Sequence, residues 1–323
     1  MKFLIIQTAF IGDVILATAV AEKLHLHYPA AHIDFLLRKG NEGLLSDHPF
    51  IKNVFTWDKK QNKIRNLLSI IKEVRANNYD HVINLHRFAS SGFITGFSGA
   101  NHKIGFDKNP LSFLFSQKII HEIGKGKHEV ERNQQLIEDI TDKHFSKPKL
   151  YPTSANFESV KQYTSAPYIC IAPTSVWFTK QFPKEKWIEL CDHLPDTINI
   201  YLLGASGDVA ACDWIKNNSN NKNIINLSGK LNFLESAALM KDAKMNYVND
   251  SAPLHIASAM NAATTAIFCS TVPSFGFGPL ATNFKLVETK EQLTCRPCGL
   301  HGHQQCPKGH FKCAYSIEIK ELL

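Results

Sequence analysis

Residues 1–23 read MKFLIIQTAFIGDVILATAVAEK, and two opposite structures fit this stretch. A lysine, an apolar run and small residues before Glu22 resemble a secretory signal with its cleavage site. However, Asp13 lies in the middle of what would be the signal's apolar core, where a carboxylate costs about 2.5–3.5 kcal/mol on insertion scales. The stretch also fits a buried strand over 3–6, a tight turn at Gly12 and a helix that carries Asp13. We therefore predict the first βα unit of the fold, retained in the mature protein.

The bulk composition is that of an ordinary globular protein, long enough for two cored domains. The chain has 323 residues, of which 44% are hydrophobic and 20% charged. No run approaches the ~20 apolar residues that a spanning helix needs. The formal net charge of +7 fits an anionic partner such as a phosphorylated sugar, a lipid head group or nucleic acid. A solvated basic surface fits it equally well.

Short apolar strands alternate with helical patterns along the chain, which predicts parallel sheets covered on both faces. The order starts again at Tyr168, and the polar stretch Ser146–Ala166 with its prolines is the best linker candidate. We therefore expect an α/β protein with two Rossmann-like, doubly wound domains, residues 1–155 and 156–323, facing a central cleft. The expected strands are 3–6, 33–37, 53–57, 81–85, 168–172, 198–203, 223–227, 245–249 and 264–268. The expected helices are 14–27, 63–76, 184–193, 209–217, 234–241 and 254–260.

Three loops follow strands and carry polar groups. The loop 7–13 has neither the G-x-G-x-x-G nor the P-loop pattern, so an NAD-dependent dehydrogenase is disfavoured. Asp13 there suits a catalytic carboxylate and a first-turn cap equally well. In loop 172–183, hydroxyl groups and an ammonium group suit phosphate oxygens, although a plain polar loop has the same composition. In loop 249–255, a proline in the first helical turn leaves backbone N–H groups that can bind an anion.

Taken together, four stretches carry a family resemblance: IGDVILATAV near the start, HEVERN at 128–133, KQFP at 180–183 and NDSAPLHIASAM at 249–260. In this order the chain resembles the ADP-heptose:lipopolysaccharide heptosyltransferases of glycosyltransferase family 9, which have the GT-B arrangement. The resemblance implies an inverting, metal-independent transfer with no cofactor, and the sequence has no Asp-x-Asp pair. It implies that Asp13 is the general base and that Lys180, with Thr174 or Ser175, holds the donor diphosphate. It places Asp250, Ser251, Ala252 and His255 in the loop that faces the donor.

The sequence departs from this family pattern at two places. Ala252 replaces the usual glycine after Asp-Ser, and Ser206 stands where relatives often carry a glutamate near the nucleoside, with Asp208 close by. The resemblance favours ADP-heptose as the donor, and these two departures leave the base and the sugar of the donor open. On the acceptor side the resemblance implies a lipid-linked phosphorylated or acidic saccharide in the N-terminal domain. The candidates for holding it are Lys60, Lys63, Arg65 and Arg87.

The C-terminal stretch 295–313 contains Cys295, Cys298, Cys306 and Cys313. A C-x-x-C pair with two further thiols is a zinc signal, but the later spacings are not those of a common zinc ribbon. Structural metal, disulfides and reduced thiols all stay open, with reduced thiols favoured. A catalytic role for these cysteines is not expected. The other four cysteines are expected to be reduced core residues.

These observations favour a cytoplasmic enzyme that transfers a heptose-like sugar to a lipid-linked acceptor, with no role in nucleic-acid binding. Peripheral contact with the inner face of the inner membrane is left open. Two alternatives remain: a sugar-nucleotide epimerase on the same fold, and a non-catalytic protein that binds anionic glycolipid.

Overall fold

The computed structural model describes all residues from Met1 to Leu323, and its contacts divide the chain into two units, Met1–Tyr151 and Pro152–Leu323. The expected boundary lay four residues further on, between 155 and 156. The difference arises from helix α5 (Ser154–Val160), which packs against a helix of the second unit. The predicted linker 146–166 is therefore partly wrong, because Thr153 caps a regular helix within it by accepting from the Asn156 N–H.

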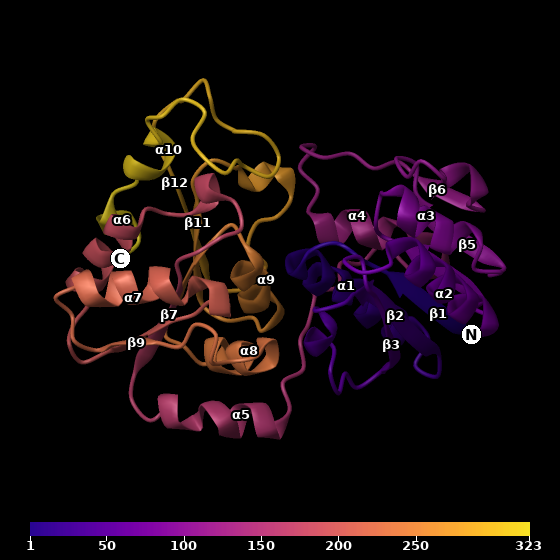
Figure 1. Ribbon diagram of the computed structural model, residues 1–323, viewed down its shortest axis with the longest axis horizontal. Helices are drawn as coiled ribbons and strands as arrows, with labels where there is room; N and C mark the ends of the chain where they lie inside the picture. Colours follow the sequence, from indigo (N-terminus) through magenta and orange to yellow (C-terminus); the bar gives the residue numbers. More distant parts are fainter. The chain divides into compact units, whose positions relative to one another are not determined.

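The first unit contains one six-stranded sheet in the order β3-β2-β1-β4-β5-β6, with every pair parallel (Figure 1). Its central strands bury apolar side chains. Among the helices of this unit, α1 packs with α4 and α2 packs with α3. The strands are β1 (Lys2–Ile6), β2 (His32–Arg38), β3 (Ile51–Trp57), β4 (His81–Asn84), β5 (His102–Phe106) and β6 (Gln117–Ile119); the helices are α1 (Ile11–His27), α2 (Lys63–Ala76), α3 (Ala89–Gly96) and α4 (Glu129–Gln135).

The second unit repeats this topology, with the sheet order β12-β11-β10-β7-β8-β9 and parallel pairing throughout. Two doubly wound α/β units are thus confirmed. The strands are β7 (Tyr168–Ala172), β8 (Asn199–Leu202), β9 (Ile224–Asn226), β10 (Asn246–Asn249), β11 (Thr264–Phe268) and β12 (Phe284–Glu288); the remaining helices are α6 (Lys184–His193), α7 (Val209–Asn218), α8 (Phe233–Lys241), α9 (Ala252–Ala259) and α10 (Lys312–Tyr315).

The opening stretch folds as the predicted strand and helix, with one correction. Helix α1 begins at Ile11, so Gly12 lies inside its first turn and not in a tight turn before it. The helix starts early because the Asp13 carboxylate accepts the N–H of Phe10 at 3.2 Å, which satisfies a donor that the first turn leaves unpaired. No helix of the structure has both the length and the apolar character needed to cross a bilayer.

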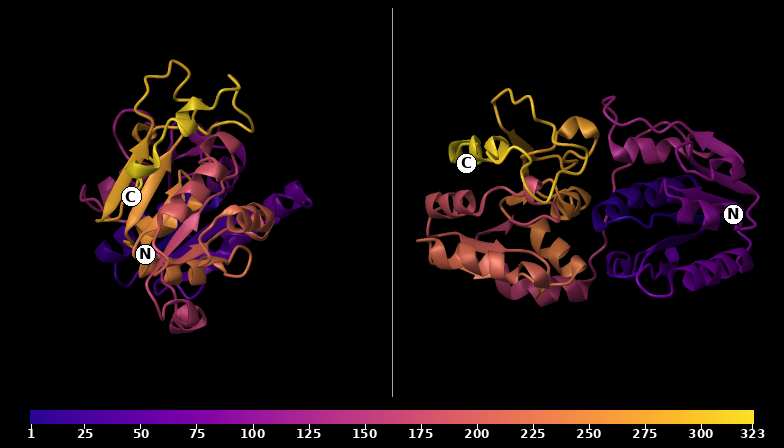
Figure 2. Two further views of the ribbon diagram at one scale, coloured as in Figure 1. Left: turned by 90° about the vertical axis from the view of Figure 1, so that its left-hand side faces the viewer. Right: turned by 45° about the horizontal axis from the view of Figure 1, so that its top comes forward.

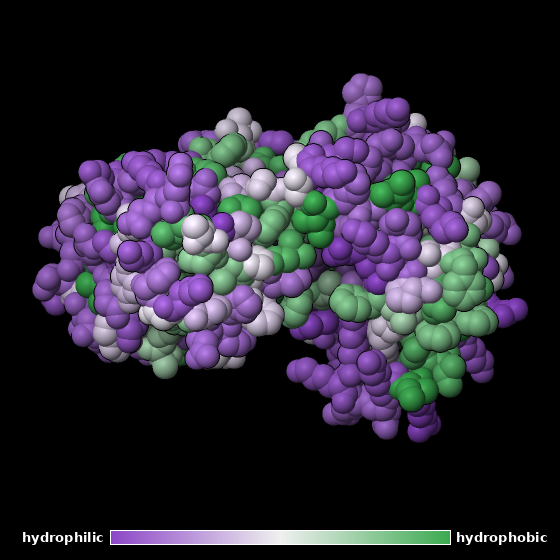
Figure 3. All heavy atoms as spheres, turned by 90° about the horizontal axis from the view of Figure 1, so that it is seen from above, coloured by the Kyte–Doolittle hydropathy of each residue, from purple (hydrophilic) through white to green (hydrophobic).

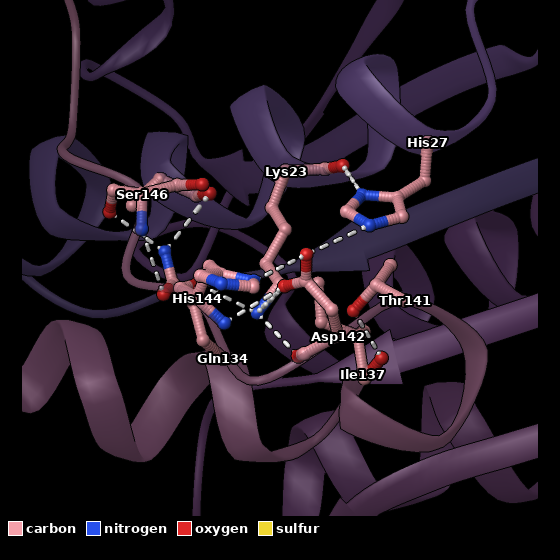
Figure 4. Close-up of polar contacts among 9 residues, drawn as sticks. Lys23, His27, Gln134, Ile137, Thr141, Asp142, His144 and Ser146 are labelled. Atoms are coloured by element: carbon pink, nitrogen blue, oxygen red, sulfur yellow. Dashed lines mark hydrogen bonds and ion pairs between the residues drawn. The ribbon is translucent and has the colours of Figure 1, made fainter.

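A buried lysine fixes the far end of α1 (Figure 4). Lys23 is 1% exposed, and its ammonium donates to the carbonyls of Asp142 at 2.6 Å and His144 at 2.9 Å. It also pairs with the Asp142 carboxylate at 3.1 Å, which His27 contacts from the next turn. These bonds tie α1 to the chain that follows α4, and so fix the helix whose first turn carries Asp13.

The last residues of the chain complete the core of the second unit. Ala314, Ile317 and Leu322 pack with Trp187 of α6 and Val287 of β12 in one buried cluster. Figure 2 shows this segment in yellow beside the orange strands β11 and β12. The Cys-rich stretch that precedes it is therefore held at both ends by packed structure.

Candidate functional site

The carboxyl ends of the strands in the first unit bring several polar groups to one edge of the sheet. Thr8 follows β1, Lys59 follows β3, and His86 and Arg87 follow β4. Helix α1 starts at the same edge and carries Asp13 in its first turn. In open α/β sheets this edge is where ligands bind.

Asp13 has an unusual ionisation at this edge. The side chain is partly buried, and burial raises its pKa to about 6, with the negative charge of Glu129 adding to the rise. The hydrogen bond from the Phe10 N–H and the positive charge of Arg87 lower the pKa of Asp13 and so limit this rise. A carboxylate with a pKa near 6 is ionised at pH 7.5 and is a better proton acceptor than an ordinary aspartate.

Lys59 points back onto the sheet edge. Its ammonium donates to the Thr8 carbonyl at 2.6 Å and to the Thr8 hydroxyl at 3.2 Å, and it lies 4.8 Å from the centre of the Trp57 ring. Burial lowers its pKa to about 8, helped by the charges of Arg38 and Lys63.

His86 completes this group in its neutral form. Burial, with the charges of Lys59 and Arg87, lowers its pKa to about 3. The Thr8 hydroxyl, which accepts from Lys59, also hydrogen-bonds with His86 Nδ1 at 3.1 Å. The edge therefore presents a cation beside a neutral imidazole, which suits an anionic ligand.

A chain of charged groups lies behind the edge. Arg87 Nη1 donates to His121 Nδ1 at 3.2 Å, so the protonated Nε2 faces Glu129 at 3.7 Å. Glu129 is also held by Arg132 through Nε at 2.8 Å and Nη2 at 2.7 Å. Burial alone would raise the pKa of Glu129, but His121 and Arg132 together hold it below its usual value. Glu129 thus stays ionised, anchors Arg87 through His121, and supplies the negative charge that acts on Asp13.

The HEVERN stretch contributes this buried pair from the first turn of α4. His128 precedes the helix and its Nδ1 accepts the N–H of Val130 at 3.1 Å, while Glu131 accepts the N–H of His128 at 2.6 Å. This reciprocal cap fixes the start of α4 and directs Glu129 and Arg132 inward.

In the second unit, two of the predicted loops meet at the carboxyl edge of the sheet. Asn249, the last residue of β10, donates to the Pro173 carbonyl at 2.9 Å and accepts the N–H of Phe182 at 2.9 Å. The loop after β7 is thereby fastened to the loop after β10. As a result, Lys180 reaches Asp250, and the two side chains form an ion pair at 2.8 Å.

The Lys180–Asp250 pair is nearly buried and has a third member. Thr271 donates its hydroxyl proton to the same Asp250 oxygen at 2.6 Å. Helix α9 begins beside the pair with Ser251 before its first residue and Pro253 in its first turn. Its first N–H groups have no acceptor within the helix, and together with an ammonium they suit a phosphate.

The Cys-rich stretch packs against the loop that carries Lys180. His303 donates its N–H to the Thr179 hydroxyl at 2.8 Å and accepts the N–H of Thr179 at 3.0 Å. Gly302 adopts a positive φ of +77°, and a Cβ atom there would lie 2.8 Å from Thr179 Oγ1 and 3.1 Å from Lys180 Cγ. The stretch therefore packs directly against Lys180, a contact that no motif in the sequence indicates.

All eight cysteines are free thiols. The four outside the tail, Cys170, Cys191, Cys212 and Cys269, are buried, as expected, and burial raises the pKa of each. In the tail, Cys295 Sγ lies 3.9 Å from His310 Nε2. No three or more His, Cys, Asp or Glu side chains of the chain are arranged to hold a metal ion.

Residues 67–306 match the model of glycosyltransferase family 9 (heptosyltransferase). The chain belongs to glycosyltransferase family 9. It is therefore a glycosyltransferase, and the fold it shares with its relatives is GT-B.

Relatives of this family 9 chain align over most of its length. It is 32% identical to lipopolysaccharide heptosyltransferase 3 of Escherichia coli K12 over 283 residues, 80% of each chain. The structure of E. coli ADP-heptose lps heptosyltransferase II covers 100% of this chain and 97% of its own, with a TM-score of 0.80 and 21% identity. The structure of E. coli heptosyltransferase WaaC with ADP covers 88% and 92%, with a TM-score of 0.71 and 21% identity. These two likenesses show the fold.

The predicted donor residues of the family 9 enzyme occupy different places along the carboxyl edge of the sheet in the second unit. Lys180, Asp250, Ser251 and Ala252 come together there, with Thr174 and Ser175 partly buried in the attached loop. His255 is 5% exposed within α9, with its ring 6.4 Å from that of Phe277. It is therefore buried against a neighbouring aromatic ring.

Ser206 and Asp208 lie after β8, at another point of this edge. Asp208 accepts the N–H of Ala205 at 2.7 Å and so closes the turn. Ser206 lines a cavity of about 400 Å³ together with Gly229 and Lys230. Neither residue is paired with the Lys180 loop in the structure, so their role toward a nucleoside stays a prediction.

The predicted acceptor residues divide into two groups. Arg87 lies at the edge beside Asp13, whereas Lys60, Lys63 and Arg65 are exposed around the start of α2. The lysine that enters the edge is Lys59, one position before the predicted one. The alternation of side-chain directions in β3 could have indicated Lys59 if it continues into the loop, because Lys59 is two residues after Trp57 and its ammonium lies over the Trp57 ring.

Proposed function

We propose that this enzyme transfers a heptose from ADP-heptose to a lipid-linked, phosphorylated or acidic core saccharide in lipopolysaccharide synthesis, at the cytoplasmic face of the inner membrane. The names of its relatives support the sugar and the pathway, and the WaaC structure with ADP supports the nucleotide. The single observation that carries the proposal is Asp13, a carboxylate at the carboxyl edge of the first sheet with its pKa raised to about 6.

Asp13 acts as the general base in this proposal. An acceptor hydroxyl attacks the anomeric carbon of the heptose, its oxygen forms the new glycosidic bond, and its proton passes to the Asp13 carboxylate. The bond between the anomeric carbon and the diphosphate oxygen breaks, and the bonding pair leaves with ADP. Because one displacement occurs, the configuration at the anomeric carbon inverts.

Lys180 and the start of α9 hold the donor diphosphate. The ammonium group exchanges part of its interaction with Asp250 for the phosphate oxygens, and the N–H groups of Ser251 and Ala252 face the same charge. Thr174 and Ser175 add hydroxyl donors from the neighbouring loop. These fixed donors stabilise the negative charge that develops on the departing ADP. Ser206 and Asp208 lie toward the nucleoside.

The acceptor's anionic groups are held in the first unit. Arg87 and Lys59 present positive charge at the edge that carries Asp13, and Lys60, Lys63 and Arg65 extend it along the surface at α2. Because Glu129 and His121 fix Arg87 from behind, its guanidinium can receive a carboxylate or phosphate with little reorganisation.

Calorimetric titration with ADP, UDP and GDP, with EDTA present, tests the donor. We expect selective binding of ADP, whereas preference for UDP or GDP would move the donor to another nucleotide. Transfer is then measured with ADP-heptose and a core acceptor, with ADP release and product formation followed together. Release of a rearranged sugar from the donor alone would indicate an epimerase, and Asp13→Asn with full turnover would refute the base.

A further inference from the structure

An apolar face of the first unit is exposed on α2, α3 and the 3-10 turn Ser112–Leu114. Phe93 on α3 and Phe97, the residue that follows this helix, are 41% and 48% exposed, with their rings stacked at 6.1 Å. Phe88, which precedes α3, is 66% exposed, and Phe113 is 70% exposed. Phenylalanines at these exposures are unusual on a surface that contacts only water.

The elements that carry these side chains are packed together. Leu114 contacts Gly96, where a Cβ atom would lie 2.6 Å from the leucine methyl, so the turn lies directly on α3. Helices α2 and α3 also contact each other, and α2 adds Ile64, 75% exposed, and Leu68, 61% exposed. Figure 3 shows hydrophobic residues gathered along the lower edge of the right-hand part of the molecule, which is this unit.

Positive charge surrounds this face. Lys60, Lys63 and Arg65 are exposed around the start of α2, and Lys108 and Lys118 are exposed in the segments on either side of Phe113. The exposed Asp107 in the same region carries an opposing negative charge, and its carboxylate accepts the N–H groups of Lys108 and His121. Exposed aromatic and aliphatic side chains flanked by basic residues are the composition of surfaces that lie on anionic bilayers.

The face is continuous with the candidate acceptor site. Phe88 follows Arg87 directly, and its ring is 4.7 Å from that of His86 at the sheet edge. An acceptor whose lipid remains in a bilayer would therefore meet apolar side chains first and Arg87 next.

We propose that the face formed by Ile64, Leu68, Phe88, Phe93, Phe97 and Phe113 rests on an anionic lipid surface. The aromatic and aliphatic side chains enter the interfacial layer, and the lysines and Arg65 contact the head groups. The proposal deepens the proposed function, since it names the surface that would bring a lipid-linked acceptor to the enzyme. Its test needs neither donor nor acceptor, so the two can fail separately.

Vesicle co-sedimentation of the full chain provides the test. The vesicles contain phosphatidylcholine alone or phosphatidylcholine with about one-third phosphatidylglycerol. We expect binding to the anionic vesicles that is at least ~10-fold stronger than to the neutral ones and that falls with added salt. The double variant Phe93→Gln, Phe97→Gln should weaken it ~10-fold or more, because two aromatic rings leave the interface.

A matched control is Phe284→Gln in β12 of the second unit, where the phenylalanine is 50% exposed. It should leave vesicle binding unchanged, and ADP binding by calorimetry should be the same in all variants. Absence of binding to anionic vesicles, or equal loss in the control, would overturn the proposal. Self-association in sedimentation velocity that the α3 double variant abolishes, without vesicle binding, would overturn it in favour of a second copy of the chain.

Discussion

Replacing Asp13 by asparagine should remove the base and at the same time stabilise the first unit. The folded-state pKa of about 6 lies above the ordinary value of 3.8, so folding opposes ionisation of this group. The contribution of Asp13 to the free energy of unfolding is therefore most favourable below pH 3.8, where the carboxyl is protonated. This advantage is lost as the pH rises through 6. Asparagine has the shape and neutrality of the protonated acid and avoids the loss.

The magnitude follows from the shift. About two pKa units at 1.36 kcal/mol each give ~3 kcal/mol, and partial exposure of the side chain to solvent reduces this to ~2 kcal/mol. For a unit of this size the melting temperature should rise by ~5 °C at pH 8. Near pH 3 the gain should disappear, because the aspartate is then mostly protonated in both states. Turnover should fall by ~100-fold or more over the working range.

Differential scanning calorimetry of both proteins between pH 3 and 8, alongside transfer kinetics, measures the two effects together. Asp58→Asn is a control of opposite sign, since the N–H groups of Lys60 and Gln61 and the Lys39 ammonium lower the Asp58 pKa. That variant should lose stability at pH 8 and little at pH 3. If Asp13→Asn melts at the same or a lower temperature at pH 8, the raised pKa is wrong.

Three further substitutions, one of them with a matched control, test the donor site and the structure that supports both sites. Lys180→Ala should weaken ADP binding ~10- to 100-fold in calorimetry, the range of lost charge-assisted hydrogen bonds, and unchanged affinity would remove Lys180 from the donor site. Gly302→Ala should lower ADP affinity several-fold by pushing on Lys180. Gly309→Ala has a similar positive φ of +71° in open space and should cost stability alone, so equal affinities in the two variants would contradict the contact. Lys23→Met should lower the melting temperature of the first unit by ~5 °C in calorimetry, since it removes the ammonium that binds two partly buried carbonyls and the Asp142 carboxylate. No change would show that these bonds are dispensable.

Much of the fold is predictable because the central strands are uniformly apolar. The strands Tyr168–Ala172 and Thr264–Phe268 and the helix Lys63–Ala76 end where the sequence indicates. The sequence does not predict strands β5, β6 and β12. β6 has only three residues, and β12 exposes its first three side chains. They are defined by pairing with a neighbour and have little local signal of their own.

Helix α4 shows a different limit. Its sequence, EVERNQQ, is polar, and nothing in its periodicity indicates a buried element. Burial becomes favourable only because Glu129 and Arg132 satisfy each other and His121 approaches from another segment. The family resemblance pointed to this stretch, but the pairing that gives it a role behind Asp13 is a tertiary property.

The two units hold the charges of Asp13 and Lys180 in opposite ways, and the residue types alone do not indicate this difference. Asp13 is partly buried and faces the charge of Glu129, so its environment disfavours the form that must accept a proton. Lys180 is already paired with Asp250, whose oxygen is also held by Thr271, so its charge is neutralised before any ligand binds. A donor diphosphate must therefore compete with a fixed carboxylate for Lys180, which favours ligands with more than one negative charge over a single anion. The sequence shows that a lysine and an aspartate are present. The selectivity for the ligand depends on the fold, which places Asp250 within 3 Å of Lys180.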